Sequence, residues 1–289
     1  MKIKLFVPYF NEQMVARINI LSAMKWVDEF HLTEVNYTHQ GKFKDYNFDY
    51  DVYSKHVDKL KYHALDVKHD FLFNRKYIPH FGGQHRPEWH PKIFFNTSWY
   101  NEGVQRNQSC DQSLIEDDDI IILSDIDEII DPRKVDMIIA AVEKHKIVTV
   151  RLNFSLLYFN LFSRSWSGPS DYSYRIFIMK GSEFRKRNFD YDTLRKLGER
   201  SQLLNEVYCL PEICGFHHSW IGNKESIKAK LNAYSHVEHR VLNDDQYIEN
   251  CLRNGKSLFD NHELCIDNSI ELLEEIEINR AQYKEFFFE

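Results

Sequence analysis

The chain has 289 residues, 43% hydrophobic and 28% charged, which is typical of a soluble globular protein with a substantial core. The formal net charge is −7 and the densest basic tract, residues 184–188, is short, so we expect no nucleic-acid partner. The chain has no signal-peptide core and no apolar run near about 20 residues, which predicts a cytoplasmic protein without a transmembrane segment. Five scattered cysteines, without Cys-x-x-Cys spacing, favour a reducing compartment.

The first third of the chain is predicted to alternate strands with a helix. Residues 3–7, 27–35 and 61–67 have the composition of strands. Asn11 is the predicted N-cap of a helix between the first two strands, and that helix has an apolar face formed by Met14, Ile18 and Leu21. A β-α-β start of this kind predicts a parallel α/β sheet.

The middle of the chain begins with a predicted loop over residues 76–91, which carry Gly82-Gly83, three prolines and three histidines. This loop could be a flap over a site or a plain connection. A helix is predicted over residues 97–115, where Trp99, Glu102 and Arg106 share one face. The simplest interpretation of this trio is an intrahelical salt bridge beside a packed tryptophan.

The apolar run at residues 119–124 is typical of a central parallel strand. After it, Asp131 and Pro132 are predicted to start a helix as N-cap and first helical residue. Strands are then predicted over 147–162 and 172–180, and a further strand is predicted to end at 214–218. A helix is predicted from about residue 224, with Ile227, Leu231 and Tyr234 on its inner face. The chain is predicted to end in an acidic helical stretch that begins with a capping box at Asn268 and Glu271.

Asp125 and Asp127 directly follow the apolar strand. They are therefore expected at its carboxyl end, where open α/β sheets bind ligands. Residues two apart in an extended chain point the same way, so both carboxylates could face one ion. Carboxylate oxygens suit Mg²⁺ or Mn²⁺, which bridge to the diphosphate of a nucleotide sugar and stabilise it as a leaving group. The pattern thus predicts a metal-dependent transferase that uses a nucleotide sugar.

Two different roles for the acidic pair agree less well with the sequence. The carboxylates could simply cap the next helix, but Asp131 already serves as that cap. Phosphatases of the haloacid dehalogenase type also place Asp-x-Asp after a strand, but near the first strand and with a threonine two residues on. Here Glu128 and Ile129 follow instead and the motif lies in mid-chain, which disfavours a phosphoaspartate mechanism.

Further candidates lie elsewhere in the chain. His217 could complete the ligands of a metal ion, although a histidine in a strand is more often structural. In the loop after the first strand, Asn11 could bind the edge of a nucleotide base and Tyr9 or Phe10 could stack on it. The candidate diphosphate partners are Arg17, Lys44 and Arg106.

Taken together, these segments resemble glycosyltransferase family 17, which includes the animal enzyme that adds the bisecting N-acetylglucosamine to N-glycans. The matching segments occur in the family's order: residues 10–12 with Arg17, 27–28, 34–44, 99–102 with Arg106, 118–129, 215–220 and 235–238. The chain departs from the family's pattern at Ile130, where a proline is usual, and at Phe216, where a tryptophan is usual. It also lacks the membrane anchor and stem of the animal relatives, so a microbial or viral glycan is the more reasonable acceptor.

The resemblance implies a GT-A-like fold, with a mixed, mainly parallel sheet flanked by helices. We expect a catalytic domain over 1–240 and a helical extension over 241–289 packed on it. It also implies an inverting mechanism with Mn²⁺ or Mg²⁺, a UDP-sugar donor, most simply UDP-N-acetylglucosamine, and a glycan acceptor. UDP-glucose or UDP-galactose is the alternative donor. The rival functions are a nucleotidyl- or phosphotransferase, for which no glycine-rich phosphate loop is found, and a non-catalytic glycan-binding protein.

These expectations assign residues to three roles. Glu128 and Glu238 are the candidates for the general base. The predicted metal ligands are Asp125, Asp127 and His217. The predicted donor-binding residues are Phe10, Asn11, Glu12, Arg17, Glu34, Lys44, Arg106 and Asp125.

Overall fold

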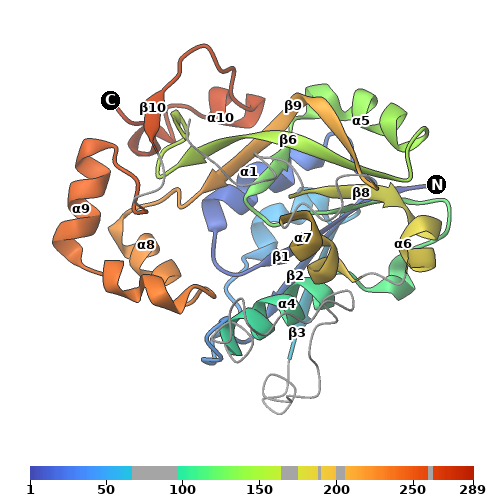
Figure 1. Cartoon of the computed structure of the whole chain (residues 1–289), viewed down its shortest axis with the longest axis horizontal. Coiled ribbons are helices and arrows are strands. Elements are labelled where there is room, and N and C mark those ends of the chain that lie inside the picture. Colours follow the sequence, from blue (N-terminus) through green and yellow to red (C-terminus); the bar gives the residue numbers. More distant parts are fainter. Residues whose placement is uncertain (67–96, 164–174, 188–189, 200–205, 260–262) are drawn as a thin grey trace.

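The computed structural model of the chain describes residues 1–66, 97–163, 175–187, 190–199, 206–259 and 263–289 (Figure 1). Within these residues, ten strands join in one sheet with the order β10-β7-β6-β8-β4-β1-β2-β3, while β5 and β9 pair off this path. The strands are β1 Ile3–Tyr9, β2 Glu29–Val35, β3 Leu60–Leu65, β4 Ile120–Leu123, β5 Glu128–Ile130, β6 Ile147–Leu156, β7 Leu161–Ser163, β8 Phe177–Lys180, β9 Tyr208–Ser219 and β10 Leu264–Ile266.

Helices connect and cover these strands in the described part of the chain. The α-helices are α1 Gln13–Ala23, α4 Thr97–Ser109, α5 Val135–Val142, α6 Gly181–Arg187, α7 Tyr191–Glu199, α8 Lys224–Leu231, α9 Asp245–Asn254 and α10 Glu274–Ile278. Short 3₁₀ helices are η1 Tyr50–His56, η2 Gln112–Leu114, η3 Pro132–Lys134, η4 Val237–Leu242 and η5 Lys284–Phe286. The predicted mixed α/β architecture with flanking helices is therefore confirmed.

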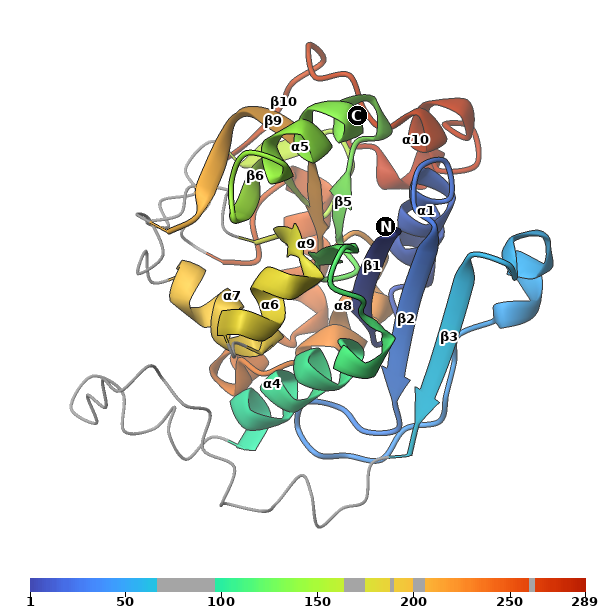
Figure 2. The same cartoon turned by 90° about the vertical axis from the view of Figure 1, so that its right-hand side faces the viewer.

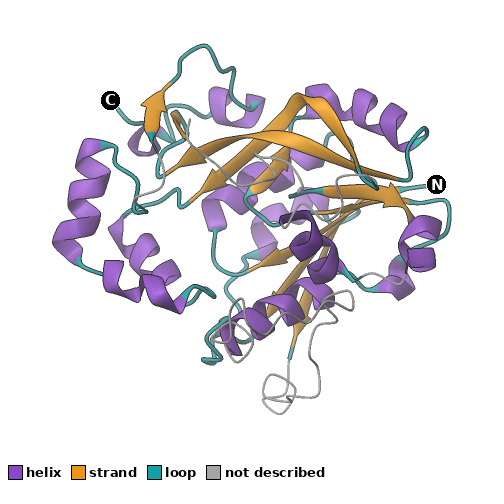
Figure 3. Ribbon diagram, viewed as in Figure 1, coloured by secondary structure: helices purple, strands orange, loops and turns teal. Residues whose placement is uncertain are grey.

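Parallel pairing is concentrated in the first half of the sheet. Strands β3, β2, β1 and β4 are all parallel. From β4 onward the neighbours β8, β6, β7 and β10 pair antiparallel, and β9 runs parallel to β6. The long strands β6 and β9 lie side by side across the molecule, with α8 and α9 together at one end (Figure 3). The four parallel strands therefore share one carboxyl edge.

The two faces of the parallel strands carry separate cores, because side chains alternate along a strand. On one face, Leu5 and Val7 of β1 pack in the same cluster as α1 and α5. On the other, Phe6 packs with Ile121 of β4 and with residues of α6 and α7. Apolar residues on both faces explain why β4 has no polar residue among its four.

The C-terminal segment, expected to be a helical extension, contains the strand β10 in addition to the helices α9 and α10. β10 joins the sheet by pairing antiparallel with β7, and α10 packs on α1 in an apolar cluster with Phe159. The predicted helix from Asn268 begins only at Glu274, with Leu273 at its N-cap position. Asp267 instead accepts the backbone N–H of Ser269, which forms a turn where the capping box was expected.

Several predicted boundaries shift for identifiable reasons. Glu12, not Asn11, stands at the N-cap of α1, and no side chain caps that end. The helix expected over 97–115 ends at Ser109, because Asp111 accepts the N–H of Ser113 and starts η2. The strand expected over 147–162 divides into β6 and β7 at Leu157, whose φ of 68° is incompatible with extended backbone.

Predicted elements elsewhere in the chain are confirmed in part. The strand expected over 172–180 is β8, which begins at Phe177; residues 175–176 form a bend, and residues 172–174 lie outside the described residues. The predicted loop over 76–91 lies outside them as well. The helix expected from 224 is α8, with Ile227 and Leu231 buried and Tyr234 beyond its end. Within the described ranges, no helix combines the length and apolar character that a membrane crossing requires.

Candidate metal centre and its charged surroundings

The carboxyl edge of the parallel strands carries the acidic motif. β1 and β4 are neighbours, so the segment after β1 and the segment after β4 emerge side by side. Asp125 and Asp127 lie in the turn that joins β4 to β5. α4 packs beside this edge, since its Val104 contacts Val35 at the end of β2 (Figure 2). The predicted location of the acidic motif at a ligand-binding edge agrees with this topology.

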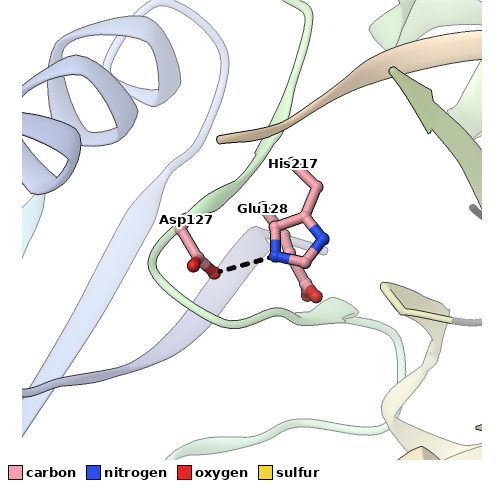
Figure 4. A group of neighbouring side chains, drawn as sticks. All are labelled: Asp127, Glu128 and His217. Carbon is pink, nitrogen blue, oxygen red and sulfur yellow. Dashed lines mark ion pairs between the residues drawn. The ribbon is translucent and has the colours of Figure 1, made fainter. Parts of the chain in front are cut away.

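Pairing of β5 with β9 brings His217 to the motif from about 90 residues away. Glu128 and His217 are direct register partners in this antiparallel ladder, and the backbone N–H of His218 donates to the Asp127 carbonyl at 2.8 Å. The Oδ1 atom of Asp127 lies 3.6 Å from Nε2 of His217 (Figure 4). Both side chains are mostly buried, with 13% and 14% of their surface exposed.

A possible metal centre follows from this pairing. Ligand atoms of Asp127, Glu128 and His217 all lie within 4.8 Å of one another. Two ligands at about 2.1 Å from one ion, in neighbouring positions, would be about 3 Å apart, so the 3.6 Å separation of Asp127 and His217 needs only a small adjustment. Carboxylate and imidazole together suit Mn²⁺, whereas Mg²⁺ prefers an all-oxygen shell. The donor set therefore fits a divalent transition-metal ion.

Glu128 is engaged by an arginine. Its carboxylate accepts hydrogen bonds from Nη1 and Nη2 of Arg195 at 2.7 and 2.6 Å, and from the backbone N–H of Asp125 at 3.1 Å. The Glu128 side chain has no exposed surface. In this arrangement the carboxylate does not face a substrate, so Asp127 and His217 are the better-placed metal ligands of the three.

Asp125 is held in a separate ion network. Arg106 donates to both of its oxygens at 3.1 and 2.8 Å, the Tyr191 hydroxyl donates at 3.0 Å, and Arg195 lies 3.1 Å away. Burial alone would raise the pKa of this carboxyl, but the two guanidinium groups outweigh it and hold the pKa well below its usual range. Asp125 and Asp127 thus turn to different partners, although the sequence suggested that both could face one ion.

Arg106 links this network to α4. It also pairs with Glu102 one turn earlier at 3.1 Å, so the intrahelical salt bridge expected from the sequence is present. Trp99 on the same helix packs edge-on against His236. Because Arg106 is buried and neutralises Asp125 and Glu102, its structural contribution is to fix the turn that carries Asp127.

Lys230 of α8 completes the charge distribution around Asp127. Its Nζ lies 3.5 Å from Oδ2 of Asp127 and 3.4 Å from Oε1 of Glu12, and 5.2 Å from the centre of the Trp220 ring. Burial would lower the pKa of Lys230, but the carboxylates of Asp127 and Glu12 raise it above its usual value. A fixed positive charge therefore lies between the two carboxylates.

The predicted donor-binding residues near β1 fall into two groups. Asn11 and Glu12 lie near Lys230, next to the candidate metal centre. Lys44 lies 5.4 Å from the centre of the Phe10 ring and pairs with Glu34. Glu34 has no exposed surface and also accepts the backbone N–H groups of Asn47 and Phe48 and the Tyr62 hydroxyl. Glu34 and Lys44 therefore fix the loop beside Phe10.

Two predicted residues are not brought to Asp127 by the described structure. Arg17 is exposed on α1, and its charge acts on Glu275 and Tyr283 of the C-terminal segment. Glu238 lies in η4, but its side chain is outside the described residues. Tyr9, predicted as one possible stacking partner for a base, is 2% exposed and packs on Phe48. Phe10 is the more accessible ring.

The sequence reasoning missed Lys230 and Arg195, which hold Asp127 and Glu128. Arg195 had a readable signal: it follows Tyr191 by four residues on the buried face of α7, and an arginine at such a position indicates a buried acidic partner. Lys230 had none, because it lies on a helix with two other lysines, Lys224 and Lys228, that pair with exposed acidic residues.

Comparisons with known proteins give weak similarities. No protein-family profile matches the sequence, and no curated protein matches it. Among solved structures, residues 1–349 of TarS from S. aureus align over 87% of this chain and 72% of that one, with 14% identity and a TM-score of 0.42. A longer TarS structure aligns over 87% and 44%, with 13% identity and a TM-score of 0.39.

Mannose-6-phosphate isomerase from Helicobacter pylori aligns over 81% of this chain and 90% of that one, with 11% identity and a TM-score of 0.33. At these values, neither protein assigns a family or an activity to the chain. The function has to be argued from the site.

Proposed function

We propose that this protein is a metal-dependent glycosyltransferase that moves a sugar from a UDP-sugar to a glycan hydroxyl. The observation that carries the proposal is the Asp127–His217 pair, 3.6 Å apart beside the carboxyl edge of the four parallel strands. The carboxylate from the turn after β4 and the imidazole from β9 would hold a divalent ion, and such an ion would bind phosphate oxygens. The sequence resemblance to family 17 adds N-acetylglucosamine as the proposed sugar and inversion as the proposed stereochemistry.

Asp127 and His217 would hold the cation, proposed as Mn²⁺. A divalent cation there supplies positive charge to the leaving diphosphate. Lys230, 3.5 Å from Asp127, is placed to donate to the same phosphate oxygens. The buried network of Arg106, Arg195 and Asp125 keeps the turn that carries Asp127 in position. Phe10, beside Lys44, offers a ring on which the nucleotide base can stack.

The transfer is proposed as a single displacement. The oxygen of the acceptor hydroxyl forms a bond to the anomeric carbon while the bond from that carbon to the diphosphate oxygen breaks, and the electron pair leaves with UDP. The hydroxyl proton passes to a carboxylate. Glu12 is the described candidate, because it lies 3.4 Å from Lys230 and lines a cavity beside the site, whereas both oxygens of Glu128 are taken by Arg195. Glu238 stays a predicted alternative.

The proposal is tested by UDP-sugar hydrolysis, in which water replaces the unknown acceptor. UDP-N-acetylglucosamine, UDP-glucose, UDP-galactose and ATP are compared with and without Mn²⁺, by UDP release and by thermal shift. We expect Mn²⁺-dependent stabilisation by one UDP-sugar and slow release of UDP. Stabilisation by ATP alone would point to a nucleotidyl- or phosphotransferase instead.

Variants connect this activity to the site. Asp127→Asn and His217→Ala should each lower Mn²⁺-dependent hydrolysis by at least about 10²-fold. Asp136→Asn, which removes an exposed carboxylate from α5, is the matched control and should retain it. Full activity in Asp127→Asn would refute the metal-centre assignment.

A further inference from the structure

A cavity of about 220 Å³ opens beside the charged centre, between the start of α1 and the segment that joins β9 to α8. It is lined by Lys230, which pairs with Asp127, by Glu12, which pairs with Lys230, and by His218, Trp220 and Ser226. At a share of about 30 Å³ per water molecule, it holds about seven waters. The space is sufficient for one sugar ring.

His218, which lines this cavity, has a buried side-chain nitrogen without a hydrogen-bond partner among the described residues. Its side chain is 1% exposed, its Nδ1 is hydrogen-bonded to Oγ of Ser155 at 2.6 Å, and its Nε2 has no hydrogen-bond partner among the described residues. The ring is fixed by stacking on Phe216 and by edge contact with Phe159. A buried polar atom of this kind calls for a partner.

The chemistry of His218 favours a hydroxyl group as that partner. The Ser155 hydroxyl can donate to Nδ1 or accept from it, so Nε2 is a donor in one tautomer and an acceptor in the other. A hydroxyl group can both donate and accept, so it satisfies either tautomer. A polyol such as a sugar presents several hydroxyl groups on one rigid ring.

Trp220 adds a second, independent sign of a built site. Its φ of 59° lies in the left-handed region, which is rare for a bulky residue and is retained only where the surroundings enforce it. The indole packs edge-on against Tyr234 and Phe259, with Lys230 over its ring. The strained backbone thus sets an aromatic wall beside the charged centre, and such walls pack against the apolar faces of sugar rings.

We propose that this cavity is the subsite for one sugar ring of the acceptor, which is hydrogen-bonded to Nε2 of His218 and packed against Trp220. The proposal rests on the proposed glycosyltransferase function and adds the substrate class and location of its acceptor. A sugar in the cavity lies next to Glu12, the carboxylate proposed to receive the hydroxyl proton. It also lies beside Lys230, which contacts Asp127, so the acceptor would be held next to the proposed metal centre.

The experiment measures sugar binding without donor or metal. Methyl glycosides of glucose, galactose, mannose and N-acetylglucosamine are titrated into the protein, and binding is followed by saturation-transfer NMR and by the imidazole ¹⁵N resonances of His218. We expect at least one glycoside to bind and to shift the Nε2 resonance. Ser226→Trp, which fills the cavity from α8, should weaken binding at least tenfold. Ala229→Trp, on an exposed position of the same helix outside the cavity, should not.

A double variant guards against a folding defect. His218→Phe/Ser155→Ala keeps an aromatic ring that can stack on Phe216 and removes both polar partners, and it should lose binding while its melting temperature shows a folded protein. The acceptor subsite would be overturned if Ser226→Trp bound every glycoside as well as the wild-type protein does. It would also be overturned if the wild-type protein bound no glycoside. Mn²⁺-dependent UDP-sugar binding is measured separately, so its loss or presence reports on the proposed function alone.

Discussion

Lys230 Nζ lies 3.5 Å from Oδ2 of Asp127, a contact between residues 103 positions apart that joins α8 to the turn after β4. The same nitrogen pairs with Glu12 at 3.4 Å. Lys230 of α8 therefore connects Glu12, which follows β1, with Asp127, which follows β4. This arrangement gives the candidate metal centre a fixed cation of its own. Substitution of Lys230 is therefore the change that best separates the binding of Mn²⁺ from catalysis.

Lys230→Met should lower the kcat of UDP-sugar hydrolysis by about 10²-fold, because a preorganised cation near the leaving diphosphate is lost. The affinity for Mn²⁺ should not fall, because the Lys230 ammonium group and the metal ion compete for the same Asp127 carboxylate. Steady-state kinetics and Mn²⁺ titration measure the two effects. Lys228→Met is the control, since Lys228 pairs with Asp245 away from the centre. Unchanged kcat in Lys230→Met would exclude a role in leaving-group stabilisation.

Glu12→Gln should lower kcat by about 10²- to 10⁴-fold with little change in the KM for the donor, because glutamine cannot take the proton yet still accepts the backbone N–H of Asn11. The measurement is the split between kcat and KM in UDP-sugar hydrolysis. Glu143→Gln, at an exposed carboxylate of the loop after α5, is the matched control. A raised KM with normal kcat would mean that Glu12 binds the donor and that another group takes the proton.

Glu128→Gln should destabilise the fold by about 3 kcal/mol, since it leaves the buried Arg195 guanidinium without its bidentate carboxylate partner. Denaturant unfolding measures this loss. The double variant Glu128→Met/Arg195→Met removes both charges and should recover part of the lost stability. If Glu128 is instead the general base predicted from the sequence, Glu128→Gln will lose activity at unchanged stability.

His31 should make the fold sensitive to mild acid. Burial lowers the pKa of His31 to about 4, with hydrogen bonds to Glu29 and the neighbouring His63 as smaller influences. Because the folded-state pKa is below the unfolded value of about 6.5, the unfolded chain binds a proton first, and stability falls as pH drops from 6.5 toward 4. At pH 5 the loss should be about 2 kcal/mol.

The variant His31→Phe, which keeps the stacking on Phe6, should flatten this part of the pH dependence. Urea unfolding at pH 7 and pH 5 compares the two proteins. An equal pH dependence in both would show that His31 titrates alike in the folded and unfolded states.

The sequence by itself determined the parallel first half of the sheet and the place of the acidic motif in it. Apolar runs and amphipathic helices are local patterns that can be recognised in the sequence. Their order, strand, helix, strand, predicts the parallel unit that β1, α1 and β2 form. The position of Asp127 after an apolar strand, and the candidacy of His217, could also be derived, because both depend on where a strand ends.

Only the tertiary structure decided which charges meet. Asp125 and Asp127 have similar sequence surroundings, yet two buried arginines hold one and Lys230 and His217 hold the other. Glu128 could be a base by sequence, and the packing of α7 against β4 makes it the partner of Arg195. Contacts between elements far apart in the chain depend on sheet order and helix packing, which no local pattern contains. That is why the cavity behind Lys230, with the unpartnered Nε2 of His218, is visible only in three dimensions.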